Sequence, residues 1–174
     1  MKSKIYITIS MIFSIGLASY LTSLDSIVDS NFSIIGNNLQ YRLTFIIWGL
    51  FTNYFLFSFL KVFEKAFNLY LALISGLLVV FLPYQPLSYP IIANLHILMG
   101  FISFALYNYL IYKTLVKQNF INYQITNKLL IIFNLLLLFE AFLVAYYMHI
   151  NSLIELTYNI VMFNLLTYLY WKIC

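Results

Sequence analysis

Six apolar runs, each about as long as a bilayer is thick, dominate this sequence. They cover approximately residues 5–24, 43–63, 66–82, 90–112, 128–150 and 153–171. A helix that crosses a membrane needs about 20 predominantly apolar residues. Charged residues make up only 8% of the chain, which is too few to cover a surface that faces water. The sequence therefore predicts an all-α fold: one domain, residues 1–174, forming a bundle of six transmembrane helices.

Polar and proline-containing stretches separate these runs. Pro90 follows a proline-containing connection and is expected in the first turn of the fourth helix. The stretch 113–127 is expected to be the longest cytoplasmic connection, with Thr126 or Asn127 capping the fifth helix. Because the connections are short, helices that follow one another should pack as antiparallel neighbours.

The basic residues indicate how the bundle is oriented. With the N-terminus in the cytoplasm, Arg42 alone falls outside and eight lysines fall inside: Lys2, Lys4, Lys61, Lys65, Lys113, Lys117, Lys128 and Lys172. Such an excess is typical of cytoplasmic loops, so both termini are predicted to be cytoplasmic. The same pattern explains the net charge of +4 without nucleic acid. The expected location is a multi-pass position in a bacterial cytoplasmic membrane, with the lipid bilayer and a membrane partner protein or homodimer as partners.

The first apolar run has two interpretations. Lys2 and Lys4 precede it, and Gly16-Leu17-Ala18 resembles a cleavage site, as in a secretory signal. An uncleaved first helix is favoured, because this run carries a polar face that can pair with the fourth helix and the rest of the chain is itself membrane-spanning.

The fourth run has a polar face. His96, Gly100, Ser103 and Tyr107 share one side of a helix, and small or polar faces of membrane helices normally point into the bundle. The first helix has a matching face that ends at Asp25, level with His96. His96 is interpreted either as a fixing hydrogen bond or, paired with Asp25, as a site for a metal, a ligand or acid–base chemistry.

His149 ends the fifth run and should lie on the same, outer side of the membrane as His96. Two histidines can bind a haem or, together with Asp25 or Asp29, a metal. No closely spaced histidine pair adds to such a site, and the one cysteine is Cys174. No cofactor is therefore predicted, and the metal or haem site stays as an alternative.

Glu140 is the most costly residue for a membrane protein. It lies about nine residues, or about 14 Å, from the outer end of the fifth helix, near the middle of the bilayer. An intramembrane carboxylate is expensive and marks a functional-site hypothesis. Asn53 and Asn159 lie at matching depths. The carboxyl is interpreted as neutral and bonded to one of these amides, or as a proton or ion relay.

Glu155 is expected to have a structural role. Ser152-Leu-Ile-Glu155 reads as a capping box at the start of the sixth helix. The sequence contains no nucleophile elbow, phosphate loop, zinc motif or dinucleotide fingerprint. An enzyme is therefore not the favoured interpretation.

Two short strings resemble one family. Asn31-Phe-Ser-Ile-Ile-Gly36-Asn37 resembles the Ser-x-x-Gly stretch after the first helix of bacterial six-helix membrane proteins of unknown function, which are similar to the DRAM and Sfk-type membrane proteins. Leu95-His96-Ile-Leu-Met-Gly100-Phe101 resembles the same family. The resemblance implies a fold and a membrane location, with no activity to transfer. It also implies that His96 and the loop 32–38 matter together.

Three hypotheses for function follow. The first is a non-enzymatic membrane protein that binds a lipid, a small molecule or a partner protein through an outward-facing polar pocket. Its candidate residues are His96, Asp25, Asp29, Ser103, Tyr107, Glu140, His149 and Asn159. The second is a proton- or ion-coupled transporter that uses Glu140. The third is a membrane enzyme or a metal or haem protein that uses His96, Asp25 and His149.

Overall fold

The computed structural model describes residues 2–64, 67–121 and 123–173, and every regular element in these ranges is helical. The elements are α1 (Lys2–Thr22), α2 (Phe32–Ile35), α3 (Arg42–Phe63), α4 (Phe67–Phe81), α5 (Pro90–Asn119), α6 (Tyr123–Tyr147) and α7 (Ser152–Ile173). Within the described ranges, five of them are long and apolar enough to cross a membrane, namely α1, α3, α5, α6 and α7. The helix α4 is apolar but shorter. The prediction of an all-α bundle is confirmed, and several of its helices are long and apolar enough to span a membrane.

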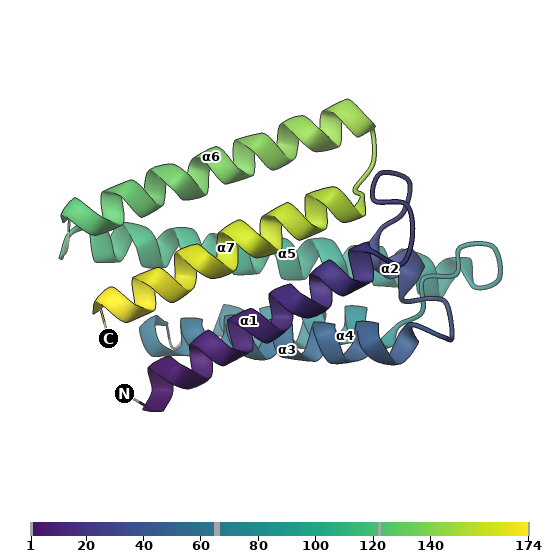
Figure 1. Ribbon diagram of the computed structural model, residues 1–174, viewed down its shortest axis with the longest axis horizontal. Helices are drawn as coiled ribbons and strands as arrows, with labels where there is room; N and C mark the ends of the chain where they lie inside the picture. The colour runs from purple at the N-terminus through teal and green to yellow at the C-terminus, as the bar shows by residue number, and fades with distance from the viewer. Residues whose placement is uncertain (1, 65–66, 122, 174) are drawn as a thin grey trace.

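The long helices lie side by side, and the two termini lie at the same end of the bundle (Figure 1). We call this the terminal end, where α3 passes to α4 and α5 passes to α6. The opposite end, which we call the loop end, carries the connections 23–41, 82–89 and 148–151. Consecutive long helices therefore run antiparallel, as their short connections predict.

The junction between α5 and α6 differs from the sequence-based expectation. The helix α5 continues to Asn119 and α6 begins at Tyr123, so the predicted connection 113–127 is mostly helical. Thr126 lies inside α6, where its hydroxyl donates to Asn119 Oδ1 at 3.1 Å, and it is not a cap. Lysine and glutamine end an apolar run, but they are good helix formers. The helix α5 therefore extends beyond the apolar run from which its end was predicted.

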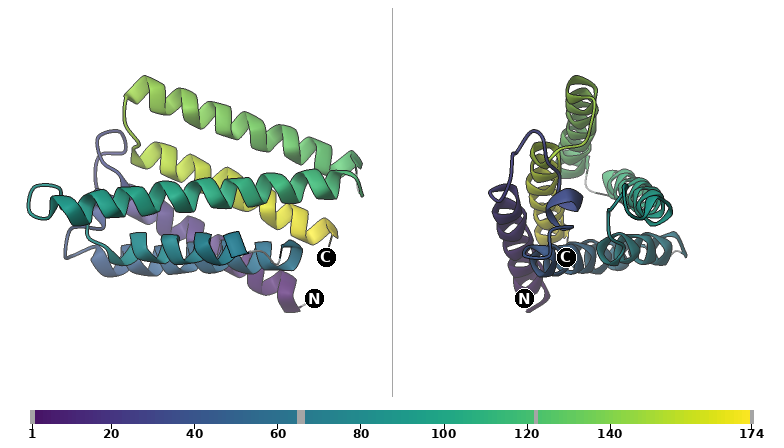
Figure 2. Two further views of the ribbon diagram at one scale, coloured as in Figure 1. Left: turned by 180° about the vertical axis from the view of Figure 1, so that it is seen from behind. Right: turned by 90° about the vertical axis from the view of Figure 1, so that its right-hand side faces the viewer.

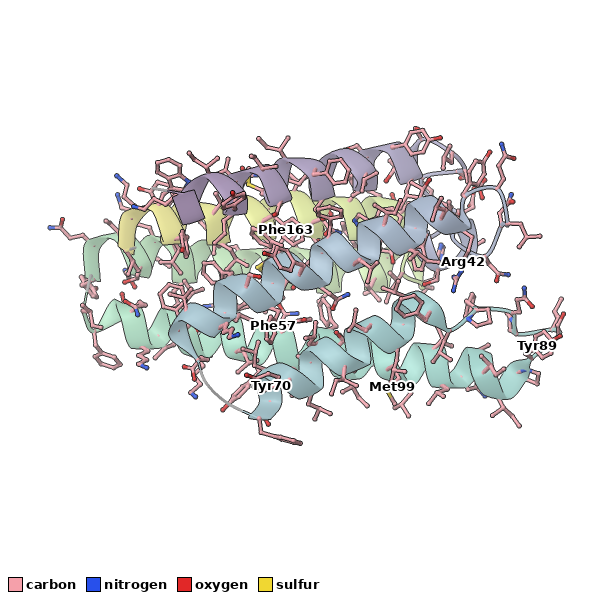
Figure 3. All side chains as sticks on the ribbon, turned by 90° about the horizontal axis from the view of Figure 1, so that it is seen from below. Arg42, Phe57, Tyr70, Tyr89, Met99 and Phe163 are labelled. Carbon is pink, nitrogen blue, oxygen red and sulfur yellow. The ribbon has the colours of Figure 1, made fainter. Side chains whose placement is uncertain are left out.

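Phenylalanines fill the centre of the bundle. Phe55 of α3 and Phe163 of α7 are fully buried, with ring centroids 4.6 Å apart. Phe57 of α3 contacts Tyr70 of α4 in an edge-on arrangement at 5.6 Å (Figure 3). Ring pairs of this kind add to the burial they bring with them. They join α3 to its neighbours on both sides.

The helix α6 is attached by a narrow strip of its surface. Its buried residues are Thr126, Leu129, Phe133, Leu136 and Glu140. Their alternating spacing of three and four is that of a coiled-coil seam. Figure 2 shows α6 at the edge of the bundle, beside α7 and away from α3 and α4. Much of the remaining α6 surface is exposed and apolar, as a lipid-facing helix requires.

Candidate functional site

The connection between α1 and α3, residues 23–41, folds back over the loop end, and we call it the cap. Its short helix α2 begins at Asn31, whose side chain accepts a hydrogen bond from the Ile34 N–H at 2.9 Å. An asparagine in this position satisfies an N–H that the first turn leaves free. Phe32 and Ile35 are buried, and Phe32 meets Trp48 of α3 with ring centroids 4.8 Å apart. The cap is thus anchored by apolar side chains that point into the bundle.

The start of α7 is bonded to the cap. The backbone N–H and the hydroxyl of Ser152 both donate to the Ser30 carbonyl, at 2.7 and 3.0 Å. The Leu153 N–H donates to the Ile27 carbonyl at 3.0 Å. Two chain segments far apart in the sequence are therefore held together backbone to backbone.

The predicted capping box is wrong. The N-cap of α7 is Asn151, whose side-chain oxygen accepts from the Ile154 N–H at 3.1 Å. Glu155 instead accepts from the Phe32 N–H at 2.6 Å, at the start of α2. A carboxylate near a helix N-terminus is favourable whichever chain segment supplies it. Glu155 therefore bonds the N-terminus of α2, in the segment 23–41, and not the N-terminus of its own helix.

His96 is buried, and both of its ring nitrogens have partners. Nδ1 lies 2.9 Å from the Leu82 carbonyl, and Nε2 lies 2.9 Å from the Ser33 hydroxyl. A carbonyl only accepts, so Nδ1 carries a proton, and in the neutral ring Nε2 accepts from Ser33. His96 therefore joins α5, the end of α4 and the cap. The structure brings His96 and the loop 32–38 together, but it does not form the pair with Asp25.

Asp25 and Asp29 are exposed and bonded within their own turn. Asp25 accepts from the Ser26 N–H and Asp29 from the Ser26 hydroxyl, both at 2.7 Å. His149 is also exposed, and its Nε2 lies 2.9 Å from the Val28 carbonyl in the cap. Its Nδ1 lies 2.7 Å from the Tyr147 carbonyl.

The candidate metal residues Asp25, His96 and His149 do not converge. Both nitrogens of His96 are bonded to Ser33 and Leu82, whereas His149 is bonded to the backbone at the bundle surface. Across residues 2–64, 67–121 and 123–173, no three His, Cys, Asp or Glu side chains are grouped so as to hold a metal ion.

Arg42 closes the loop end from the side of α3. Its guanidinium donates to the carbonyls of Val80 and Phe81 at 3.0 and 2.9 Å, and to that of Gly36 at 3.3 Å. The last carbonyls of a helix have no partner within it and carry partial negative charge. Arg42 thus caps α4, and Figure 3 shows it at the same end as Tyr89. Sequence reasoning assigned it no role beyond orientation.

Ser103 and Tyr107 face into the bundle, as the polar face of the fourth run predicts. The Ser103 hydroxyl donates to the Ala72 carbonyl at 3.2 Å, and the Tyr107 hydroxyl donates to Asn53 Oδ1 at 3.3 Å. Gly76 of α4 makes room for this group, because a Cβ there would lie 2.9 Å from the Ser103 hydroxyl and closer still to Asn53 Oδ1. The cluster joins α3, α4 and α5 by polar contacts in an apolar setting.

Glu140 is the one predicted site residue whose carboxyl is short of hydrogen-bond donors. The Thr157 hydroxyl donates to Oε1 at 2.9 Å, but it also lies 2.9 and 3.0 Å from two carbonyls of α7. One proton is therefore shared among three acceptors. Oε2 is buried, with no hydrogen-bond partner among the residues that the structure describes.

The expected partners of Glu140 are engaged elsewhere. The Asn159 amide donates to the Glu155 carbonyl at 2.6 Å, and the Asn53 amide donates to the Gly49 carbonyl at 2.8 Å. A buried polar group without a partner is rare in native proteins and calls for a physical reason. The structure therefore singles out Glu140 over the other candidates.

The fold and these contacts define a helical bundle with several helices long and apolar enough to cross a membrane. Hydrogen bonds hold the cap to α7, and the Glu140 carboxyl is short of donors inside the bundle. Glu64 also has a buried oxygen without a described partner, but its other oxygen is paired with Lys113. Comparisons with models of protein families, with curated proteins and with solved structures found no match to the chain.

Proposed function

We propose that this chain crosses the membrane six times, with both termini in the cytoplasm. Its described lysine side chains support this topology, since all of them belong to the terminal end: Lys4, Lys61, Lys113, Lys117, Lys128 and Lys172. Lys65 and the side chain of Lys2 fall outside the described part of the chain. Arg42 lies at the loop end, but its charge is directed at backbone carbonyls. The short helix α4 packs between α3 and α5 and crosses with them.

The single cysteine, Cys174, offers a direct test of this topology. A maleimide that cannot cross membranes should label Cys174 only after the cells are permeabilised. In a Cys174→Ser background, a Ser88→Cys variant places the thiol in the exposed 82–89 connection and should be labelled in intact cells. Labelling of Cys174 in intact cells would contradict the orientation.

Within this topology, we propose a non-enzymatic binding function in the outer half of the bundle. The ligand is a lipid, a small molecule or a partner segment that offers a hydroxyl or ammonium group to Glu140. The observation that carries the proposal is the shortage of donors at the Glu140 carboxyl. An unmet buried acceptor costs about 1–3 kcal/mol, and a donor from a ligand recovers it.

The position of Glu140 suits such a ligand. It lies about two turns before the end of α6 at Tyr147, within reach of the loop end. Because α6 is attached by a narrow seam, a molecule from the bilayer can approach Glu140 between α6 and its neighbours without displacing the central phenylalanines.

The test is a thermal-unfolding series of the purified protein with dodecylamine or dodecanol as probe. A ligand that binds the folded state raises the unfolding temperature with its concentration. Dodecylamine or dodecanol should stabilise the wild type and leave Glu140→Gln unaffected. Glu155→Gln is the matched control and should respond as the wild type does. An equal response of wild type and Glu140→Gln would contradict the proposal.

Proton-coupled transport is the second candidate, and the same carboxyl favours it. A carboxyl in an apolar seam that lacks fixed donors is suited to take up and release a proton. In liposomes with an imposed pH gradient, the wild type should then carry protons and Glu140→Gln should not. Equal proton flux in the two would exclude this candidate, whereas the dodecylamine series tests binding separately.

A further inference from the structure

A groove separates α6 and α7 at the terminal end. Its volume is about 440 Å³, and its lining residues are Gln124, Ile125, Lys128, Leu129, Ile132 and Tyr168. The first five come from α6 and the last from α7. The buried strip of α6 packs against α5 and α7. The groove lies between α6 and α7 near the start of α6, whereas Glu140 lies in the second half of that helix. Figure 1 shows the start of α6 and the end of α7 at the terminal end.

The mouth of the groove is cationic and polar. Lys128 and Gln124 are exposed on the α6 wall. On the α7 wall, Tyr168 is 47% exposed, and the Lys172 ammonium lies 5.6 Å from the centroid of its ring. Lys128 therefore lines the groove itself, and Lys172 lies beside Tyr168, which lines its α7 wall.

Among the side chains that the structure describes, no carboxylate forms an ion pair with these two lysines. Of the five acidic residues in the chain, Glu64 is the one at the terminal end, and its Oε2 is paired with Lys113 at 2.9 Å. The positive charge at the groove is therefore uncompensated by Glu64, and an anion is the ligand that complements it.

The inner part of the groove is apolar. Ile132 lies one helical turn deeper than Lys128 on the same face of α6, and Ile125 and Leu129 complete that wall. Lys128 itself is about 8 Å along the helix from the start of α6, the depth at which a lysine side chain reaches the headgroup region. A polar, cationic mouth above an apolar wall matches the two parts of a phospholipid.

We propose that this groove binds an anionic phospholipid, with its phosphate between Lys128 and Lys172 and an acyl chain along Ile132. Basic pockets between transmembrane helices on the cytoplasmic side are suited to such headgroups. Tyr168 and Gln124 supply neutral hydrogen-bond donors to the same headgroup. The site is separate from the one proposed at Glu140, and it differs from it in ligand charge and in membrane side.

The bound lipid has a mechanical consequence. Because α6 is held by one narrow seam, a lipid wedged between α6 and α7 adds a second line of contact at the terminal end. It therefore binds the assembled bundle better than a bundle from which α6 has separated, and it stabilises the folded state.

The test measures lipid affinity by native mass spectrometry, with phosphatidylglycerol and phosphatidylcholine as probes. The wild type should retain phosphatidylglycerol in preference to phosphatidylcholine. The Lys128→Gln/Lys172→Gln variant should bind phosphatidylglycerol at least about ten-fold more weakly. Lys61→Gln and Lys117→Gln remove exposed lysines at the same end and should leave the affinity unchanged. A double variant with wild-type affinity would overturn the proposal.

Further measurements separate an intact lipid from a free anion. Inorganic phosphate at equal concentration should not stabilise the protein against heat; protection as strong as that by the lipid would overturn the lipid assignment. Added salt should weaken phosphatidylglycerol binding, because the contact is between exposed charges. Glu140→Gln should keep full phosphatidylglycerol affinity, so a failure of the site at Glu140 and a failure of this groove give different results.

Discussion

The Ser33 hydroxyl lies 2.9 Å from Nε2 of His96, and this bond joins the cap to α5. Its strength can be measured with a double-mutant cycle, which isolates the coupling of a contacting pair. We expect Ser33→Ala and His96→Ala each to lower the free energy of unfolding, with a coupling energy of about 0.5–1.5 kcal/mol. Additive effects would show that the bond contributes nothing.

Arg42 should matter more than any other basic residue for stability. Its guanidinium bonds the final carbonyls of α4, and charged hydrogen bonds of this kind contribute about 1.5–3 kcal/mol. We expect Arg42→Ala to lower the free energy of unfolding by an amount in that range. Arg42→Lys should recover only part of it, because an ammonium lacks the planar fork. Lys117→Ala, an exposed lysine of α5, is the control and should change stability little.

Two glycines predict opposite outcomes for the same substitution. Gly76→Ala places a methyl group against Asn53 and Ser103, and overpacking of this kind costs about 1–3 kcal/mol. Gly16 is an exposed helical residue, and a Cβ added there would meet nothing within 4 Å. There, alanine should stabilise the helix by about 0.5–1 kcal/mol. Thermal unfolding of the two variants side by side tests the packing of α3, α4 and α5, and equal effects would contradict it.

Asn151 is expected to stabilise the N-terminus of α7 as its N-cap. Its side-chain oxygen is bonded to the Ile154 N–H, and loss of an N-cap costs about 0.5–2 kcal/mol. Asn151→Ala should therefore destabilise the protein, whereas Asn151→Asp, which keeps the acceptor, should change stability little. If both variants lose the same stability, the cap assignment does not hold.

The helices were predictable from the sequence because their signal is strong and local. Runs of apolar residues as long as a bilayer leave few alternatives to a helical bundle. The ends of α5 and α6 were not predictable in the same way. Lysine and glutamine between residues 113 and 127 mark where the apolar surface stops, but they continue the helix to Asn119 and begin the next at Tyr123.

The hydrogen-bond partners of the buried polar residues were harder to predict than their burial. The interior placement of His96, Ser103 and Tyr107 follows from their shared helical face, and the structure has all three buried. Their partners depend on how distant segments meet. Ser33 and Leu82 flank His96 only because the cap folds back, and no spacing in the sequence contains that information.

The predicted capping box shows most clearly that sequence spacing alone does not identify hydrogen-bond partners. Ser152 and Glu155 have the spacing of a local motif in which both side chains accept from backbone N–H groups. Glu155 does accept from an N–H, but the Ser152 hydroxyl donates to a carbonyl. The bonds go to Ser30 and Phe32 in the cap. A tertiary contact thus replaced the local one, and no spacing within the sequence indicates that contact.

The bonds between the cap and α7 have a consequence for biosynthesis. The ribosome makes residues 23–41 before α7, yet Ser152, Leu153 and Glu155 supply bonds that hold the cap. Until α7 has been made and has packed, the carbonyls of Ile27 and Ser30 lack these partners. The loop end of the bundle therefore closes only after α7 is in place, and a chain halted before α7 has a cap without these bonds.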